Sequence, residues 1–217
     1  MLGISSMIHA VDFFVVFDDV NFINCGWINR NYILARGERS RITLELQGAS
    51  QNLLINQVSV GNNRIKLLKS IQHAYGKAPR FKWVFPMIEE LLMNKEPNLA
   101  RYLDNSIKRI AQYLDLNPHW IMSSELNKDS TLRGQDKVLA ICNELGTSNY
   151  INMPGGKELY DYQSFELEGI NLSFIQPASD EYAQFGRPFV PYLSIIDVMM
   201  FNDQEQCLEL LRGYDLE

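Results

Sequence analysis

The sequence predicts an α/β protein with a mostly parallel sheet flanked by helices and an added antiparallel hairpin. Two observations predict this class. Short apolar or alternating segments with the period of a strand are separated by longer segments whose apolar residues recur at helical spacing. With 217 residues, 46% of them hydrophobic, the chain can bury a large core. We expect a single domain over residues 1–217, because no low-complexity linker interrupts the regular alternation of segments.

The first elements are a helix, a strand and a hairpin. Apolar residues share one face of a helix over residues 5–10, which runs into an apolar strand over residues 12–17. Residues 33–35 and 42–46 alternate around a turn at residues 36–39, as the strands of a hairpin do. The same alternation over residues 55–60 predicts another short strand.

Helices dominate the rest of the chain. Apolar spacing predicts helices over residues 64–75, 81–93, 98–114, 193–201 and 203–211, a helical turn at 165–167, and strands over 119–122, 149–152 and 170–175. A further helix opens at Ser130 and closes at Gly146. The resulting strand–helix–strand unit has a right-handed crossover, which places the loops after its strands at one edge of the sheet.

Charge and composition narrow the function classes. The net charge of -6 argues against wholesale nucleic-acid binding, so we expect no DNA partner. The three cysteines and three histidines stand far apart, which argues against a disulfide framework or a zinc site, and we predict no metal ligands. No stretch approaches the ~20 apolar residues of a membrane helix, and no signal peptide opens the chain. We therefore expect a cytoplasmic protein.

Residues 17–31 hold the richest candidate site. An apolar strand ends in two carboxylates, Asp18 and Asp19. An aromatic, two amides and a guanidinium follow within five positions, namely Trp27, Asn29, Arg30 and Asn31. Ligand sites of α/β sheets gather at the carboxyl ends of strands, and a guanidinium fork grips carboxylates or phosphates. The alternative to a ligand site is a strand end followed by an Asn-rich turn with a core tryptophan. That interpretation gives the two carboxylates and Arg30 no structural role.

Further polar clusters follow other predicted strands. Ser123, Ser124 and Glu125 can hold a phosphate or accept a proton, or they form a helix N-cap. Gly155 and Gly156 resemble a backbone nest for an anion beside Tyr160, or they form a tight turn. We expect these two clusters to meet the two carboxylates at one sheet edge.

Two late features add candidates. Tyr182 and Gln184 lie in an irregular segment and can contact a sugar, or they only pack a surface loop. Asp197 lies among apolar residues of a predicted helix, so we expect it to be partly buried and to need a partner, and Arg30 is one candidate.

Six blocks of the sequence carry a family resemblance. Asp18-Asp19-Val20 followed by Trp27-x-Asn29-Arg30-Asn31 resembles the signature of the WbqC-like proteins, and further blocks follow in order at residues 49–56, 75–79, 123–126, 150–160 and 193–197. Similar proteins begin with a strand and a His-Gln-Pro segment, which this sequence is expected to lack, through a clipped reading frame or a shortened variant. The resemblance implies a bacterial protein of O-antigen or other surface-polysaccharide biosynthesis.

The activity that the resemblance implies is transfer of an amino acid, glycine in particular, to a sugar. Its partners would be a sugar nucleotide or amino sugar and an aminoacyl donor, and no particular cofactor is indicated. Asp18 or Asp19 would then act as the base, and Arg30 with the asparagines would hold the oxyanion or phosphate. Two other hypotheses stay open: a non-catalytic protein that binds sugar nucleotides in the same pathway, and a nucleotidyltransferase-like enzyme.

Overall fold

The computed structural model describes residues 3–178, 180–186 and 188–217. Helix α1 (Gly3–Ala10) leads into strand β1 (Phe13–Val16), which pairs in parallel with β6 (His119–Met122). The register sets Val16 opposite Met122, so the segments that follow both strands leave the sheet at the same edge. This pairing therefore brings two polar segments together that lie about a hundred positions apart in the chain.

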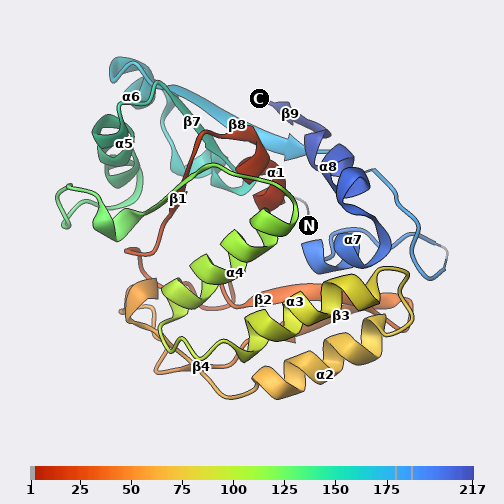
Figure 1. Cartoon of the computed structure of the whole chain (residues 1–217). Coiled ribbons are helices and arrows are strands. Elements are labelled where there is room, and N and C mark those ends of the chain that lie inside the picture. The colour runs from red at the N-terminus through yellow and green to blue at the C-terminus, as the bar shows by residue number, and fades with distance from the viewer. Residues whose placement is uncertain (1–2, 179, 187) are drawn as a thin grey trace.

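The hairpin and three helices form the lower part of Figure 1. Strands β2 (Arg30–Ala35) and β3 (Glu38–Thr43) are antiparallel, and Arg36 and Gly37 make the turn with φ of 56° and 79°. That left-handed backbone matches the twist of a two-residue hairpin. Around the hairpin run helices α2 (Arg64–Tyr75), α3 (Phe81–Met93) and α4 (Leu99–Tyr113).

The upper part of Figure 1 is a second α/β unit. Helix α5 (Gly134–Leu145) ends at Gly146, whose φ of 61° is the usual backbone of a helix C-terminus. Strand β7 (Asn149–Asn152) pairs in parallel with β8 (Asn171–Pro177), and β9 (Tyr214–Leu216) pairs antiparallel with β8. The 3₁₀ helix η3 (Pro154–Leu159) and helix α6 (Tyr162–Leu167) connect β7 to β8.

The remaining elements are short. Helices α7 (Ile195–Phe201) and α8 (Gln204–Arg212) are capped by the side chains of Ser194 and Asp203. Strands β4 (Leu46–Gln47) and β5 (Ser59–Val60) flank the 3₁₀ helix η1 (Ile55–Gln57), and η2 (Ser123–Glu125) follows β6 directly. Among the described residues, no helix combines the length and the apolar character needed to cross a membrane.

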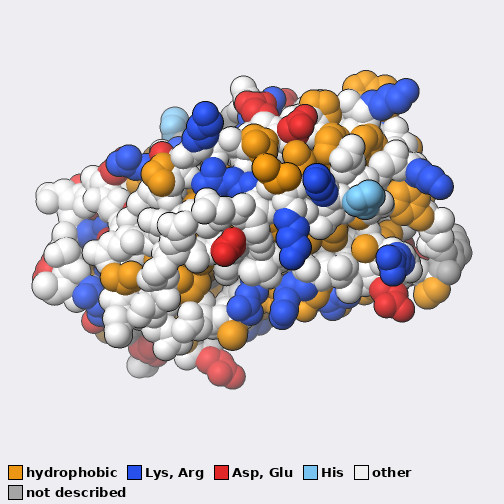
Figure 2. All heavy atoms as spheres, turned by 90° about the horizontal axis from the view of Figure 1, so that it is seen from below, with side chains coloured by type: hydrophobic (Ala, Val, Ile, Leu, Met, Phe, Trp, Pro, Cys, Tyr) orange, Lys and Arg blue, Asp and Glu red, His pale blue; other side chains and the backbone are white. Residues whose placement is uncertain are grey.

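Three groups of buried side chains make the core. The largest joins α1, the hairpin, α2, α3 and the C-terminal helices, with Ile33, Ile71 and Met199 at most 2% exposed. A second lies between α4, β3 and β5, and a third between α5, α6 and β8. On the face seen in Figure 2, Lys and Arg side chains are spread among hydrophobic ones instead of forming one continuous basic patch.

The predicted α/β class and the added hairpin are confirmed. The parallel pairings are β1–β6 and β7–β8, and hydrogen bonding divides the strands of the described residues among four small sheets. The predicted strand over residues 55–60 is wrong in its first half, where the chain forms η1. The helix predicted to open at Ser130 begins at Gly134, and β9 was not predicted.

Candidate functional site

Asp18 joins three segments at the end of β1. It is 2% exposed, and its Oδ1 accepts a hydrogen bond from the backbone N–H of Ser124 at 2.9 Å. The Nδ2 of Asn56 donates to its Oδ2 at 3.0 Å, and the backbone N–H of Asn56 donates to its carbonyl oxygen at 3.0 Å. The carboxylate thus holds η1 and η2 against the end of β1.

Asp19 lies at the centre of a charged cluster. Ser123 donates to its Oδ1 at 2.6 Å, while the ammonium groups of Lys128 and Lys137 lie 3.0 and 3.1 Å from its Oδ2. Lys137 also donates to the carbonyl oxygen of Asp19 at 2.8 Å, and Lys128 donates to the carbonyl oxygen of Ser123. Both lysine side chains are almost fully buried.

Both ammonium groups of this cluster, Lys128 and Lys137, face the carboxylate of Asp19, and buried charges need such compensation. Asp18 is held instead by neutral donors of Asn56 and Ser124. Burial alone would raise the pKa of Asp19, but the hydrogen bond from Ser123 and the two ammonium groups outweigh it and lower that pKa below its ordinary value. A carboxylate held in this way stays ionised and is a weak base.

A polar cavity of about 580 Å³ opens beside this cluster, within the size range of small-molecule sites. Its walls come from the ends of β1 and β6, from η1 and η2, and from one face of α4. The side chains that can meet a ligand there include two acids, two cations, an aromatic and an exposed hydroxyl: Asp104, Glu125, Arg101, Lys108, Trp120 and Ser124.

One atom of the polar cavity lacks a partner. Asp104 pairs with Lys108 at 2.8 Å through Oδ2, and the same ammonium lies 5.9 Å from the ring centroid of Trp120. The other oxygen of Asp104, Oδ1, is buried and accepts no hydrogen bond from the described residues. Because a buried acceptor without a donor is costly, this oxygen offers a place for a donor group of a ligand.

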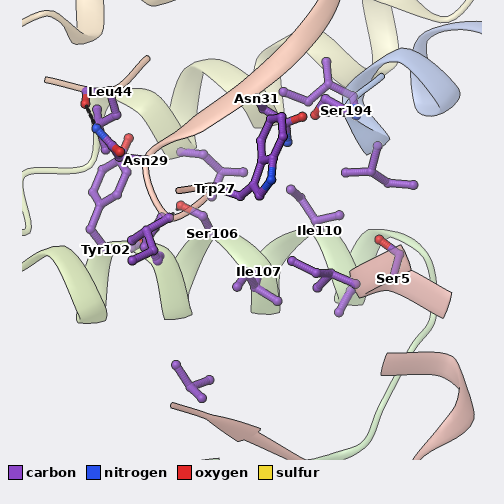
Figure 3. A pocket seen from close by; sticks show the side chains of 18 of the residues that line it. Ser5, Trp27, Asn29, Asn31, Leu44, Tyr102, Ser106, Ile107, Ile110 and Ser194 are labelled. Carbon is purple, nitrogen blue, oxygen red and sulfur yellow. Dashed lines mark hydrogen bonds between the residues drawn. The ribbon is translucent and has the colours of Figure 1, made fainter. Parts of the chain in front are cut away.

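The segment Trp27–Asn31, which runs into the start of β2, lines a second cavity, of about 540 Å³ and mainly apolar (Figure 3). Trp27, Asn29, Arg30 and Asn31 all line it. The amide of Asn29 donates to the carbonyl oxygen of Leu44 at 2.8 Å, which ties this segment to the end of the hairpin. Asp18 lines both cavities, so the Asp18 strand end and the Trp27–Asn31 segment share this second cavity.

The Gly155 cluster lies at the end of β7. Gly156 packs against Asn152, whose Nδ2 donates to the hydroxyl of Tyr160 at 2.9 Å. A link to the charged cluster runs through α5: the side chain of Gln135 accepts from the backbone N–H of Asp161 at 2.6 Å, and Lys137 two positions on contacts Asp19. Gly155, Gly156 and Tyr160 therefore lie near the same end of α5 and line neither cavity.

Tyr182 and Gln184 surround Asp197. The hydroxyl of Tyr182 and the amide of Gln184 donate to Asp197 Oδ2 at 2.6 and 2.9 Å, and Tyr75 donates to Oδ1 at 2.7 Å. Asp197 is fully buried, which is deeper than the partial burial predicted from the sequence. The predicted pairing of Asp197 with Arg30 is wrong, because neutral donors occupy both carboxylate oxygens.

The family assignment follows from the whole chain. The model of the WbqC-like protein family matches residues 1–209, which include both cavities and the charged cluster. The chain belongs to the WbqC-like protein family. It is also 23% identical to the uncharacterized protein Rv1507c of Mycobacterium tuberculosis over 97% of this chain and 92% of that protein. No solved structure matches the chain significantly.

Several groups of this WbqC-like protein escaped the sequence analysis. Lys137 occupies the buried face of α5 beside Val138 and Ile141, and a lysine within an apolar stripe is a usable sign of a buried ion pair. Asp104 and Lys108 have the i,i+4 spacing of an ordinary surface ion pair on α4, so the sequence did not indicate that they line a cavity. No three His, Cys, Asp or Glu side chains gather as metal ligands among the described residues.

Proposed function

We propose that this WbqC-like protein is a transferase of bacterial surface-polysaccharide biosynthesis that passes an aminoacyl group, glycyl in particular, to an amino sugar bound in the polar cavity. The observation that carries the proposal is the composition of that cavity. An indole, three carboxylates, two cations and a hydroxyl surround a volume of about 580 Å³. An aromatic face suits the apolar side of a pyranose, while carboxylates accept hydrogen bonds from its hydroxyl and amino groups.

The unpartnered oxygen of Asp104 supports an amine ligand. An amino group that donates to Oδ1 would satisfy a buried acceptor of the cavity to which no described residue donates. Arg101 and Lys108 supply positive charge for the phosphates of a sugar nucleotide. The cavity therefore offers separate groups for the amine, the ring and the phosphates of such a substrate.

Aminoacyl transfer to an amine has simple requirements. The amine nitrogen attacks the acyl carbon of the donor, an amide bond forms, and the bond from the acyl group to its carrier breaks. The carrier leaves with the electron pair, and the amine loses a proton to a base. Glu125 is exposed and lines the cavity, so we assign it the proton transfer together with Asp104.

Asp18 and Asp19 receive a different role in this proposal. Both oxygens of Asp18 accept hydrogen bonds, and the lowered pKa of Asp19 makes it a weak base. They position η1, η2 and thereby Ser124 and Glu125 at the cavity. Asp19 is a positioning residue, and the proton transfer is assigned instead to Glu125 and Asp104, which line the cavity.

The test is a transfer assay on the purified chain. Amino-sugar nucleotides and glycyl donors are incubated with the protein, and mass spectrometry follows the added mass of a glycyl group on the sugar. We expect Glu125→Gln and Asp104→Asn to lower the rate by about 10²-fold or more. The exposed Glu144→Gln, on α5, is the matched control and retains the rate. Equal rates for Glu125→Gln, Asp104→Asn and the control would contradict the proposal.

The second candidate is a non-catalytic protein that binds sugar nucleotides in the same pathway. The observation in its favour is that the first two carboxylates of the family signature are fully engaged in holding the fold. Binding of the sugar nucleotide without any transfer, measured by calorimetry with the same variants, would favour this candidate over the enzyme.

A further inference from the structure

The apolar cavity has walls from many parts of the chain, which include residues of α1, α2, α3 and the start of α7. One wall is β1 with its continuation to Phe17, and the opposite wall is the hairpin. Between them runs the inner face of α4, whose Ile107 and Ile110 line the cavity (Figure 3). Its volume of about 540 Å³ is far larger than the voids of an ordinary close-packed interior.

Polar groups gather at one side of this apolar cavity. Figure 3 shows Trp27 among the lining residues, with Asn31 on one side of it and Ile110 of α4 on the other. Trp27 is 57% exposed, so the cavity meets solvent at this residue. Arg30 lines the same cavity, and its Nε is buried without an acceptor among the described residues.

The walls and the polar side point to one class of ligand. An apolar cavity holds water poorly, because a water molecule needs two to four polar partners. A hydrocarbon chain fills such a space and meets its aliphatic walls without loss of hydrogen bonds. A buried guanidinium N–H without an acceptor calls for an anionic oxygen. The ligand that satisfies both is a single hydrocarbon chain with an anionic head group.

We propose that the cavity between β1, α4 and the β2–β3 hairpin binds a single-chain anionic amphiphile, with the chain against Ile107 and Ile110 and the head group at Arg30. The head group is a carboxylate or a phosphate, so the source is a fatty acid or an isoprenyl phosphate. This inference does not depend on the proposed transfer, because Ser124 and Glu125 line the polar cavity alone.

The test measures binding of three probes to the purified chain by calorimetry below their micelle concentrations. The probes are dodecanoic acid, farnesyl phosphate and the uncharged dodecanol. We expect the two anionic probes to bind the wild type with at least about tenfold higher affinity than dodecanol, since a hydrogen bond to a charged group contributes about that factor. The stronger of the two anionic probes identifies the source of the head group.

Two pairs of variants separate chain binding from head-group binding. Ser106→Leu adds volume inside the cavity and lowers the affinity for all three probes, whereas Leu167→Trp on the exposed end of α6 leaves them unchanged. Arg30→Gln lowers the affinity for the anionic probes about tenfold and leaves the affinity for dodecanol unchanged. The control Arg41→Gln, at an exposed position of the same hairpin, leaves the affinities for all three probes unchanged.

Three outcomes would overturn this inference. One is absence of binding by either anionic probe at concentrations just below the micelle limit. Another is equal affinity of wild type and Ser106→Leu, with circular dichroism showing that the variant is folded. The third is an Arg30→Gln variant whose affinity for dodecanol falls by as large a factor as its affinity for dodecanoic acid. If Ser106→Leu fails to fold, the probes are compared on Arg30→Gln and Arg41→Gln, and equal losses in both would contradict the proposal.

Discussion

Asp19, which is partly buried, and Asp197, which is fully buried, have opposite surroundings. Asp19 contacts the ammonium groups of Lys128 and Lys137, whereas Asp197 accepts only from the neutral groups of two tyrosines and a glutamine. The pKa of Asp19 is lowered, while burial raises the pKa of Asp197 and the three hydrogen bonds offset this only in part. The charge of the partners decides whether the raising effect of burial on a carboxyl pKa is overcome.

The difference matters for function. The cluster around Asp19 lies next to the polar cavity and fixes its walls with full charges, which gives the proposed ligand site rigid support. The cluster around Asp197 ties β2, α2 and the segment before α7 together, because Tyr75 also accepts a hydrogen bond from the backbone N–H of Leu34 at 2.9 Å. One cluster shapes a cavity, and the other holds the core.

The largest effect is expected from removing the charge of Asp19. Asp19→Asn leaves two buried ammonium groups without their carboxylate, and breaking a buried ion pair costs about 3–5 kcal/mol. Urea denaturation at pH 7 measures the free energy of unfolding. The exposed Asp12→Asn is the control and should stay within about 0.5 kcal/mol of the wild type. A cost for Asp19→Asn as small as that of the control would show that the ion pairs do not hold the fold.

The next largest effect is expected at the other cluster. Tyr75→Phe removes one hydroxyl that donates to Asp197 and accepts from Leu34, so two buried groups lose a partner. We expect a loss of about 2–4 kcal/mol in the same assay, since each unsatisfied buried group costs about 1–3 kcal/mol. The half-buried Tyr113→Phe serves as the comparison, because its hydroxyl has no hydrogen bond to any described residue. Equal losses in the two variants would contradict the role of the Tyr75 hydroxyl.

A smaller loss is expected for Tyr182→Phe. Gln184 still donates to the same oxygen of Asp197, so the carboxyl group keeps a partner there and the expected loss is about 1 kcal/mol. Ligand binding in the polar cavity should be unchanged, because Tyr182 does not line it. Calorimetry with the ligand identified in the transfer assay checks this point, and weaker binding would return Tyr182 to the list of sugar contacts.

The two clusters should also respond to pH in opposite directions. Asp19, with its lowered pKa, stabilises the fold above the unfolded pKa of about 3.9, and this contribution is lost as the pH falls through the folded pKa. Asp197, with its raised pKa, stabilises the fold below about 3.9, and that contribution is lost as the pH rises through the folded pKa. Unfolding of Asp19→Asn and Asp197→Asn against the wild type, from pH 3 to pH 7, measures both trends.

Local patterns predicted much of the fold. Alternation and the Arg36–Gly37 turn were enough for the hairpin, and helical spacing located α2, α3 and α4 closely. Residues 55–60 have the alternation of a strand, yet the side chain of Gln57 accepts from the backbone N–H of Leu54 and the chain turns into η1. Strand β9 depends on pairing with β8, and the sequence of its three residues does not predict this pairing.

The candidate site was harder to predict from the sequence, because its contacts join residues that lie far apart in the chain. The position of Asp18 and Asp19 at a strand end was visible, and so was the Ser123 segment after the next strand. Their actual partners, Asn56 and Lys137, lie 38 and 118 positions away from these aspartates. Only the pairing of β1 with β6 and the packing of α5 bring these groups together.

The most direct test is a carbon-13 NMR titration of the aspartate carboxyl groups in the folded wild type. It observes both carboxyls in one sample, without any substitution that disturbs the clusters. We expect Asp19 to titrate below the ordinary aspartate pKa of about 3.9 and Asp197 to titrate above it. An Asp19 carboxyl that titrates at or above the ordinary value would contradict its role as an ionised anchor of the cavity and would restore it as a candidate base.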